Sequence, residues 1–242
     1  CCAEGIPVVP QGGNTGLVGA GVLGKPGGLI ISLARMNAIS PPDISGGSIA
    51  VDAGVILEYL HQALEGKGLI FPMHMGSEGS AQIGGLIATN AGGSHAFRYG
   101  MMQDLVLGLE VVLADGTIWN GMRAVQKDNA GYQLRKLFCG SEGTLGIVTR
   151  AILKLSQEPK QYFTALLAVK DSLGLVKLAA KLREECAEFL TAMEFFSDVG
   201  LDISLGNIPD LVFPLQNRTS FYLLVEAGSG SMQVPLDSIL SG

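Results

Sequence analysis

The sequence predicts an α+β fold in two parts, a glycine-rich first part followed by the beginning of a second α+β domain. Glycine accounts for 34 of the 242 residues, about twice its usual share of roughly 7%. Short runs of branched residues alternate with segments of helical spacing. Near Glu158-Pro159 glycine becomes sparse, and longer strand and helix patterns follow. We therefore predict one domain over residues 1–157 and the start of another over residues 158–242.

The first part combines short strands with two helices. Before the apolar run Ile6–Val9, the letters CCAEG resemble the last turn of a helix closed by Gly5. Apolar spacing predicts helices over Ile56–Glu65 and Ile83–Ala88. A hairpin is expected where Ala114-Asp115-Gly116 joins two strands. Branched residues predict strands at Leu29–Leu33, Ile49–Asp52, Leu69–Phe71, Val106–Leu113, Thr117–Trp119 and Ile147–Leu155.

The second part alternates strands and helices. The pattern predicts strands at Phe163–Val169, Ala192–Phe196 and Phe221–Glu226, and helices at Leu173–Glu185 and Val199–Leu205. The final letters PLDSILSG resemble the start of a further helix. Because both ends look like interrupted elements, we expect this chain to be a piece of a longer protein, truncated at both ends.

Charge and cysteine content exclude several classes of protein. With 16 basic and 22 acidic side chains the net charge is −6, and basic clusters are lacking, so nucleic acid and anionic membranes are poor partners. The longest uncharged stretches contain glycine and polar residues, which argues against a membrane-spanning segment. Four cysteines without a C-x-x-C pair suggest a reducing compartment, the cytoplasm or the mitochondrial matrix.

Three loops of small residues carry the binding chemistry. The segment from Gly12 to Gly16 follows a strand, and its glycines would permit the positive φ angles of an anion-binding nest. A second loop spans Met75–Gly93, and the N-terminus of the helix at Ile83–Ala88 would add its dipole. The third, Gly140–Thr144, repeats the pattern of Gly76–Ser80. Without basic side chains, these loops suggest a flat dinucleotide whose phosphates are held by backbone N–H groups, and an ordinary turn is the alternative for the first loop.

Other nucleotide motifs and metal motifs are weak. Gly19 to Lys25 spells G-x-x-x-x-G-K, but Pro26 lacks the hydroxyl that would hold magnesium. A Rossmann G-x-G-x-x-G is not present. Among the histidines, His61 is expected on a helix surface, while His74 and His95 flank the second loop. Since no metal-ligand spacing exists, structural roles are favoured for all three.

These motifs together resemble a known family. IPVVPQGGNTGLVGAG, MGSEGSAQIGGLIATNAGG, RYG, LGLEVVLADGT, KDNAGYQL and LFCGSEGTLGIVT are similar to the FAD-binding domain of the vanillyl-alcohol oxidase/p-cresol methylhydroxylase superfamily. Within it they resemble the D-2-hydroxyacid dehydrogenase branch, above all its D-2-hydroxyglutarate dehydrogenase type, and also its D-lactate dehydrogenases and glycolate oxidase flavoprotein subunits. The resemblance implies a two-subdomain FAD-binding domain of the p-cresol methylhydroxylase type, then the start of a ferredoxin-like α+β substrate (cap) domain.

The resemblance also implies which residues would touch a non-covalent FAD. The pyrophosphate and nearby flavin would lie against Gly12, Gly13, Asn14, Thr15, Gly16 and Leu17. The second side would be Gly76, Ser77, Ser80, Ile83, Gly84, Gly85, Thr89, Asn90 and Gly93. The ribose and adenine would meet Glu142, Gly143, Ile147 and Val148. The chain departs from the family at His74, where aspartate is frequent. Catalytic residues and a divalent metal such as zinc would belong to a region beyond Gly242, so none is assigned here.

The implied reaction is oxidation of a D-2-hydroxy acid to the 2-keto acid by hydride transfer to flavin. Implied partners are the small hydroxy acid, an electron acceptor (electron-transfer flavoprotein, a quinone or a cytochrome) and, as one option, a second copy of the chain. Two alternatives stay open: a flavin-binding electron-transfer subunit without substrate chemistry, and a nucleotide-phosphate binding module.

Overall fold

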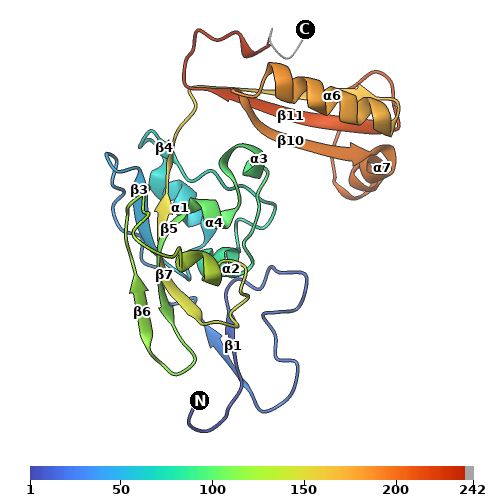
Figure 1. Ribbon diagram of the computed structural model, residues 1–242. Coiled ribbons are helices and arrows are strands. Elements are labelled where there is room, and N and C mark those ends of the chain that lie inside the picture. The colour runs from blue at the N-terminus through green and yellow to red at the C-terminus, as the bar shows by residue number, and fades with distance from the viewer. Residues whose placement is uncertain (238–242) are drawn as a thin grey trace. The chain divides into compact units, whose positions relative to one another are not determined.

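A computed structural model describes residues 1–237, and these form two compact units. The first unit contains Cys1–Gly93 and Tyr99–Glu158, and the second contains Ser94–Arg98 and the chain from Pro159 onward (Figure 1). The inclusion of Ser94–Arg98 in the second unit was not predicted. The assignment of flavin-binding and substrate domains to residues 1–157 and 158–242 remains a prediction.

The first unit is built on a four-stranded antiparallel sheet of order β3-β7-β5-β6. Beside it are two smaller sheets, a parallel β1-β2 pair and an antiparallel β4-β8 pair. The strands are β1 (Val8–Gln11), β2 (Leu29–Ser32), β3 (Ser48–Asp52), β4 (Leu69–Ile70), β5 (Val106–Val112), β6 (Ile118–Gly121), β7 (Ile147–Lys154) and β8 (Ser156–Gln157). The predicted hairpin is confirmed as the β5-β6 pair.

Two helices place the loops of the first unit. On α1 (Leu57–Leu64), Leu57, Leu60 and Leu64 are buried at the helical spacing that predicted them. The second helix, α2 (Ile83–Ala88), has the predicted bounds and buries Ile83, Leu86 and Ile87. Three single-turn helices were not predicted, namely α3 (Ala96–Tyr99), α4 (Met102–Leu105) and α5 (Arg135–Phe138). The apolar faces of α1, α2 and the large sheet share one core.

The first five residues differ from their prediction. CCAEG forms a hydrogen-bonded turn, in which the Gly5 amide donates to the Cys2 carbonyl at 3.2 Å, and no helix is present there. Gly5 does have the left-handed backbone expected of a closing residue, with φ of 64°. Five residues are too few to offset the cost of helix nucleation without tertiary contacts.

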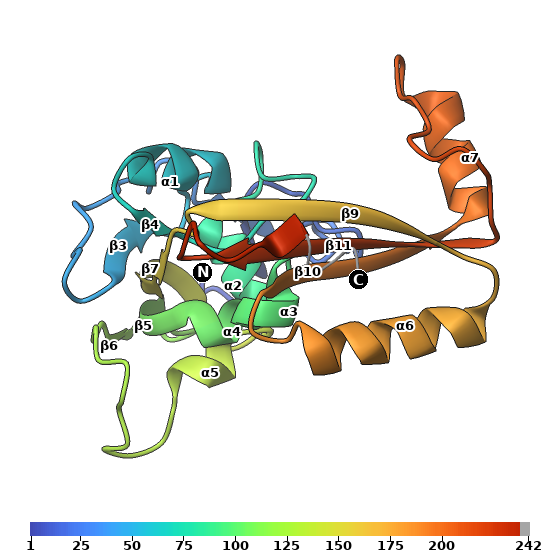
Figure 2. The same cartoon turned by 90° about the horizontal axis from the view of Figure 1, so that it is seen from above.

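The second unit is a three-stranded antiparallel sheet with two helices. The strands β9 (Gln161–Val169), β10 (Leu190–Ser197) and β11 (Phe221–Ser229) take the order β10-β11-β9. Because β11 lies between β9 and β10, the β9–α6–β10 segment is a split β-α-β unit, as at the start of a ferredoxin-like domain. In both views α6 (Ser172–Glu185) runs alongside the strands, and α7 (Asp198–Asn207) follows β10 (Figure 1 and Figure 2).

The predicted α+β fold class is confirmed, and every longer element of the second unit has nearly the predicted bounds. None of the helices within residues 1–237 is long and apolar enough to cross a bilayer. The last predicted helix, in PLDSILSG, falls largely outside the described residues.

Candidate functional site

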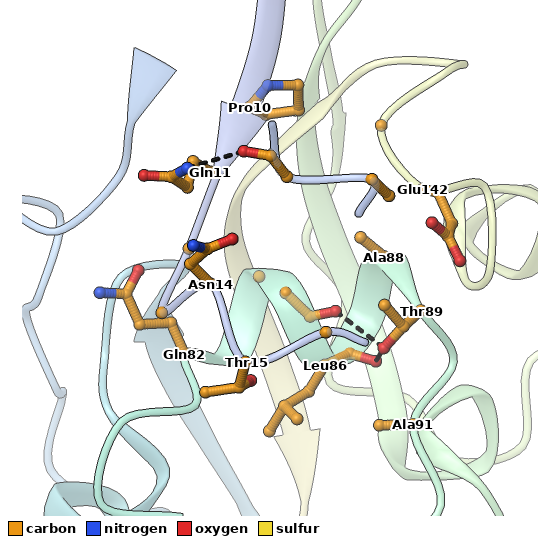
Figure 3. Close-up of a pocket in the computed structure, with 18 of the residues that line it drawn as sticks. Pro10, Gln11, Asn14, Thr15, Gln82, Leu86, Ala88, Thr89, Ala91 and Glu142 are labelled. Carbon is orange, nitrogen blue, oxygen red and sulfur yellow. Dashed lines mark hydrogen bonds between the residues drawn. The ribbon is translucent and has the colours of Figure 1, made fainter. Parts of the chain in front are cut away.

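A cavity of about 420 Å³ lies in the first unit, where the three small-residue loops meet. Its walls are the loop after β1, the segment around α2, and the loop that leads into β7. Figure 3 shows side chains from all three, with Asn14 and Thr15, Leu86 and Thr89, and Glu142 around the same space. This volume is within the range of about 300–1,000 Å³ typical of cofactor sites.

Most of the residues assigned by resemblance line this cavity. Fourteen of the nineteen do so: Gly12, Gly13, Asn14, Thr15, Gly16, Leu17, Ser77, Gly84, Gly85, Thr89, Glu142, Gly143, Ile147 and Val148. The other five do not, namely Gly76, Ser80, Ile83, Asn90 and Gly93. Ile83 is fully buried in the core, and the Asn90 side chain accepts a hydrogen bond from the Gln103 amide at 2.9 Å. These two residues therefore stabilise the segments that form the cavity wall without lining the cavity themselves.

Sequence reasoning missed thirteen lining residues: Pro10, Gln11, Val18, Ala20, Gly21, Leu33, Met75, Gln82, Leu86, Ala88, Ala91, Ser141 and Gly146. All except Leu33 lie within the three quoted glycine-rich motifs, so taking each motif as a continuous wall would have assigned them. Leu33 is different, because it reaches the cavity through the pairing of β2 with β1. No local signal in the sequence indicates it.

The conformation of the first loop corrects one prediction. Gly12, Gly13 and Gly16 do not have positive φ, and the left-handed residue of this loop is Asn14, with φ of 53°. Gly13 is needed for another reason. A Cβ at this position would collide with the carbonyl oxygen of Ser80 and lie 2.8 Å from its carbonyl carbon. Two backbones thus pass so closely that only glycine fits.

Backbone strain is concentrated at this cavity. Among residues 1–237, four non-glycine residues have positive φ: Asn14, Asn90, Glu142 and Asp210. Asn14 and Glu142 line the cavity, and Asn90 lies just after the C-terminal end of α2, which forms part of the cavity wall. Such conformations cost of order 1–3 kcal/mol each and persist where surrounding contacts impose them, frequently at binding sites.

The third loop is bound to the end of α2. The Glu142 amide donates to the Ala88 carbonyl at 2.9 Å, and the Gly140 amide donates to the Ile87 carbonyl at 3.0 Å. These bonds satisfy carbonyls at the C-terminus of α2. At the opposite end, the amides of Ile83 and Gly84 donate to the Val55 and Ala53 carbonyls. These two N–H groups at the N-terminus of α2 are therefore already paired within the protein.

The cavity is nearly neutral and partly apolar. Glu142 is the one charged side chain among the described residues that line it, and basic side chains are absent from that set. Leu17 and Val18 line the cavity yet are 101% and 78% exposed, so they form an uncovered apolar surface. The amide oxygen of Gln82 is buried and has no hydrogen-bond partner among the described residues. A ligand with a flat apolar ring and polar edges fits this combination.

The histidines occupy different places. His95 belongs to the second unit, where its Nε2 atom is 2.8 Å from Oε1 of Glu226, so the prediction of a structural role fits it. His61 was expected at the surface, but its side chain is only 20% exposed, and its ring lies close to the ring of His74 in a tilted arrangement. Burial, and next the neighbouring His74, lower the pKa of His61 from its ordinary value.

Comparison with known proteins identifies the family. The sequence profile of the FAD binding domain family matches residues 1–121, half of the chain, so the chain belongs to this family. FAD is accordingly the cofactor of the domain, as the resemblance implied. The fold is that of an alkyldihydroxyacetonephosphate synthase structure, with a TM-score of 0.78 over 99% of this chain and 48% of the other, at 19% identity.

Curated relatives are more similar to this chain in sequence. The chain is 40% identical over 231 residues to a D-2-hydroxyglutarate–pyruvate transhydrogenase of Saccharomyces cerevisiae, which covers 96% of this chain and 46% of the relative. It is 39% identical over 226 residues to the mitochondrial D-2-hydroxyglutarate dehydrogenase of Arabidopsis thaliana, covering 93% and 40%. The chain thus spans somewhat less than half the length of these relatives.

Proposed function

We propose that FAD binds non-covalently in the cavity of the first unit. The loop from Gly12 to Leu17 would hold the pyrophosphate and nearby flavin, residues of the second loop and α2 would form the other side, and Glu142, Gly143, Ile147 and Val148 would meet the ribose and adenine. The observation that carries this assignment is a cavity without basic side chains, walled by closely packed backbone. Without cations, the phosphates would depend on backbone N–H donors.

We further propose that the full gene product carrying this sequence oxidises a D-2-hydroxy acid to the 2-keto acid. Identity of about 40% to enzymes named for D-2-hydroxyglutarate, over more than nine-tenths of this chain, supports this class of substrate. The chemistry that bound FAD would supply is acceptance of the substrate's α-hydrogen as hydride, while the hydroxyl proton would pass to a base. The residues of this chain would position the cofactor and exclude water from it. The electrons would then pass to an external acceptor.

A substrate clamp is not apparent in the second unit. One of its cationic side chains, Arg218, donates to Asp198 at 2.8 Å and to Asp202 at 2.6 Å, and these bonds raise its pKa. Three others, Lys177, Lys181 and Arg183, lie on α6, where Lys181 pairs with Glu185. No histidine follows His95 in the sequence. We therefore expect residues 1–242 alone to bind flavin without turning over a hydroxy acid.

The test uses the full gene product and this chain side by side. Bound flavin should be reduced by D-2-hydroxyglutarate, D-lactate or glycolate in the full gene product, and the L-enantiomers of the first two should be inactive. Reduction by none of these acids, combined with flavin that exchanges electrons with a carrier protein, would favour the electron-transfer alternative. Substrate turnover by residues 1–242 at a comparable rate would show that the active site lies within this chain, contrary to our proposal.

The same relatives support a proposal for cellular location, and the family resemblance supports one for the electron acceptor. The Arabidopsis relative is named as a mitochondrial enzyme, and the four cysteines of this chain are unpaired. We propose the mitochondrial matrix, with electron-transfer flavoprotein, a quinone or a cytochrome as acceptor. Fractionation of cells and assay with each acceptor would separate these options.

A further inference from the structure

We propose that His61, His74 and Glu78 form a binding site for a divalent transition metal ion of the zinc class, beside the second small-residue loop. His61 comes from α1, and the other two come from the segment that leads from β4 to α2. This site is separate from the flavin proposal and does not depend on it.

The three side chains converge closely enough to share one ion. One ligand atom from each residue lies within 4.8 Å of the other two. Oε2 of Glu78 is 3.2 Å from Nδ1 of His74 and 3.7 Å from Nδ1 of His61. With zinc–ligand bonds of about 2.0–2.2 Å in a tetrahedron, ligand atoms stand about 3.4 Å apart. Two of the three pairs are near that separation already, and a small rotation of the rings would bring the third to it.

The chemistry of the donor set indicates which ion would bind. Two imidazoles and one carboxylate suit zinc and its neighbours in the transition series, whereas magnesium and calcium prefer oxygen ligands throughout. Three protein ligands would leave a fourth position to water or another small ligand. The negative charge of Glu78 would offset part of the charge of the ion.

The surroundings of His61 also fit a ligand. Its Nδ1 atom faces Glu78, while its Nε2 atom is buried without a hydrogen-bond partner among the described residues. With a metal ion on Nδ1, the Nε2–H group would remain free to donate to a carbonyl or a water, which is the bond that ordinarily fixes the ring of a metal-bound histidine.

A metal here would join a helix to a cavity wall. Met75 and Ser77, which line the cavity, stand between His74 and Glu78 in the sequence. An ion bound to both flanking residues and to α1 would hold this segment in place.

The test measures zinc binding to residues 1–242 in which Cys1 and Cys2 are replaced by serine, because thiolates are zinc ligands and these two exposed thiols would compete with the site. After treatment with a chelator, we expect one Zn²⁺ per chain, by competition with a chromogenic chelator. H61Q, H74Q and E78Q should each weaken the affinity at least about tenfold. E58Q is the matched control, because Glu58 is a carboxylate of α1 outside the cluster, and its affinity should stay within about threefold.

Two further measurements keep the proposal falsifiable if a variant is unstable. Co²⁺ should give a visible absorption spectrum of a nitrogen- and oxygen-ligated ion, and this spectrum should be lost in E78Q. Zn²⁺ should raise the Tm of the parent chain more than that of E78Q, with circular dichroism confirming that metal-free E78Q is folded. Absence of stoichiometric zinc, or equal affinity in the three variants and the control, would show a hydrogen-bonded cluster that binds no metal.

Discussion

Replacement of Gly13 by alanine tests whether the first loop owes its shape to close backbone contact. The added Cβ would collide with the Ser80 carbonyl oxygen and lie 3.3 Å from the Cα of Ala81. Carbon atoms are best placed at about 3.5–4.0 Å, so the first loop and the segment around Ser80 would have to separate. Both carry or adjoin residues that line the cavity.

The expected loss of flavin affinity follows from the cost of overpacking. Inserting a methyl group into a tightly packed site costs about 1–3 kcal/mol. If about half of the upper end of this range destabilises the flavin-bound state specifically, flavin affinity decreases at least about tenfold, because a tenfold change in affinity corresponds to roughly 1.4 kcal/mol. The larger β-branched side chain of Gly13→Val should lower affinity further.

Gly24→Ala is the matched control for this experiment. Gly24 belongs to the same connection between β1 and β2 but does not line the cavity, its φ is not positive, and a Cβ there would meet no atom within 4 Å. Flavin retained after dialysis and titration of flavin fluorescence measure the affinities, while Tm confirms folding. Equal affinities for Gly13→Ala and Gly24→Ala would refute the argument from backbone contact.

Three further predictions concern the cofactor, the thiols and a helix cap. Acid precipitation should release all bound flavin, whereas colour kept in the pellet would reveal a covalent link. Cys1 and Cys2 should react quickly with a thiol reagent at pH 8. Cys139 should react slowly, because burial raises its pKa to about 11 and leaves only about a thousandth of it as thiolate at that pH. Four equally fast thiols would contradict this prediction, as would a Cys139 reaction rate that does not rise with pH. Asp171→Ala removes the side chain that caps α6 by accepting a hydrogen bond from the Gly174 amide at 2.7 Å. The free energy of unfolding should therefore fall by about 1 kcal/mol. An unchanged denaturation midpoint would argue against the cap.

The sequence determined the longer elements and the segments that form the cavity. The bounds of α2 agree with the prediction because its apolar residues repeat at helical spacing within a single glycine-rich stretch. α6 is found nearly as predicted because it follows a capping Asp171 and carries a long periodic pattern. The small residues of the three loops indicated a site for phosphates because few other functions need so much flexible, closely packed backbone.

The tertiary structure decided which atoms meet. The four-residue helices α3, α4 and α5 are too short to show a period, and the β4-β8 pair joins strands separated by most of the first unit. The close approach of Gly13 to Ser80 depends on two loops far apart along the chain, so φ preferences alone pointed to the wrong residue. His61 and Glu78 are seventeen positions apart, and only the packing of α1 against the following loop brings them together. Local patterns record which conformation a segment prefers, whereas contacts between segments depend on how the whole unit packs.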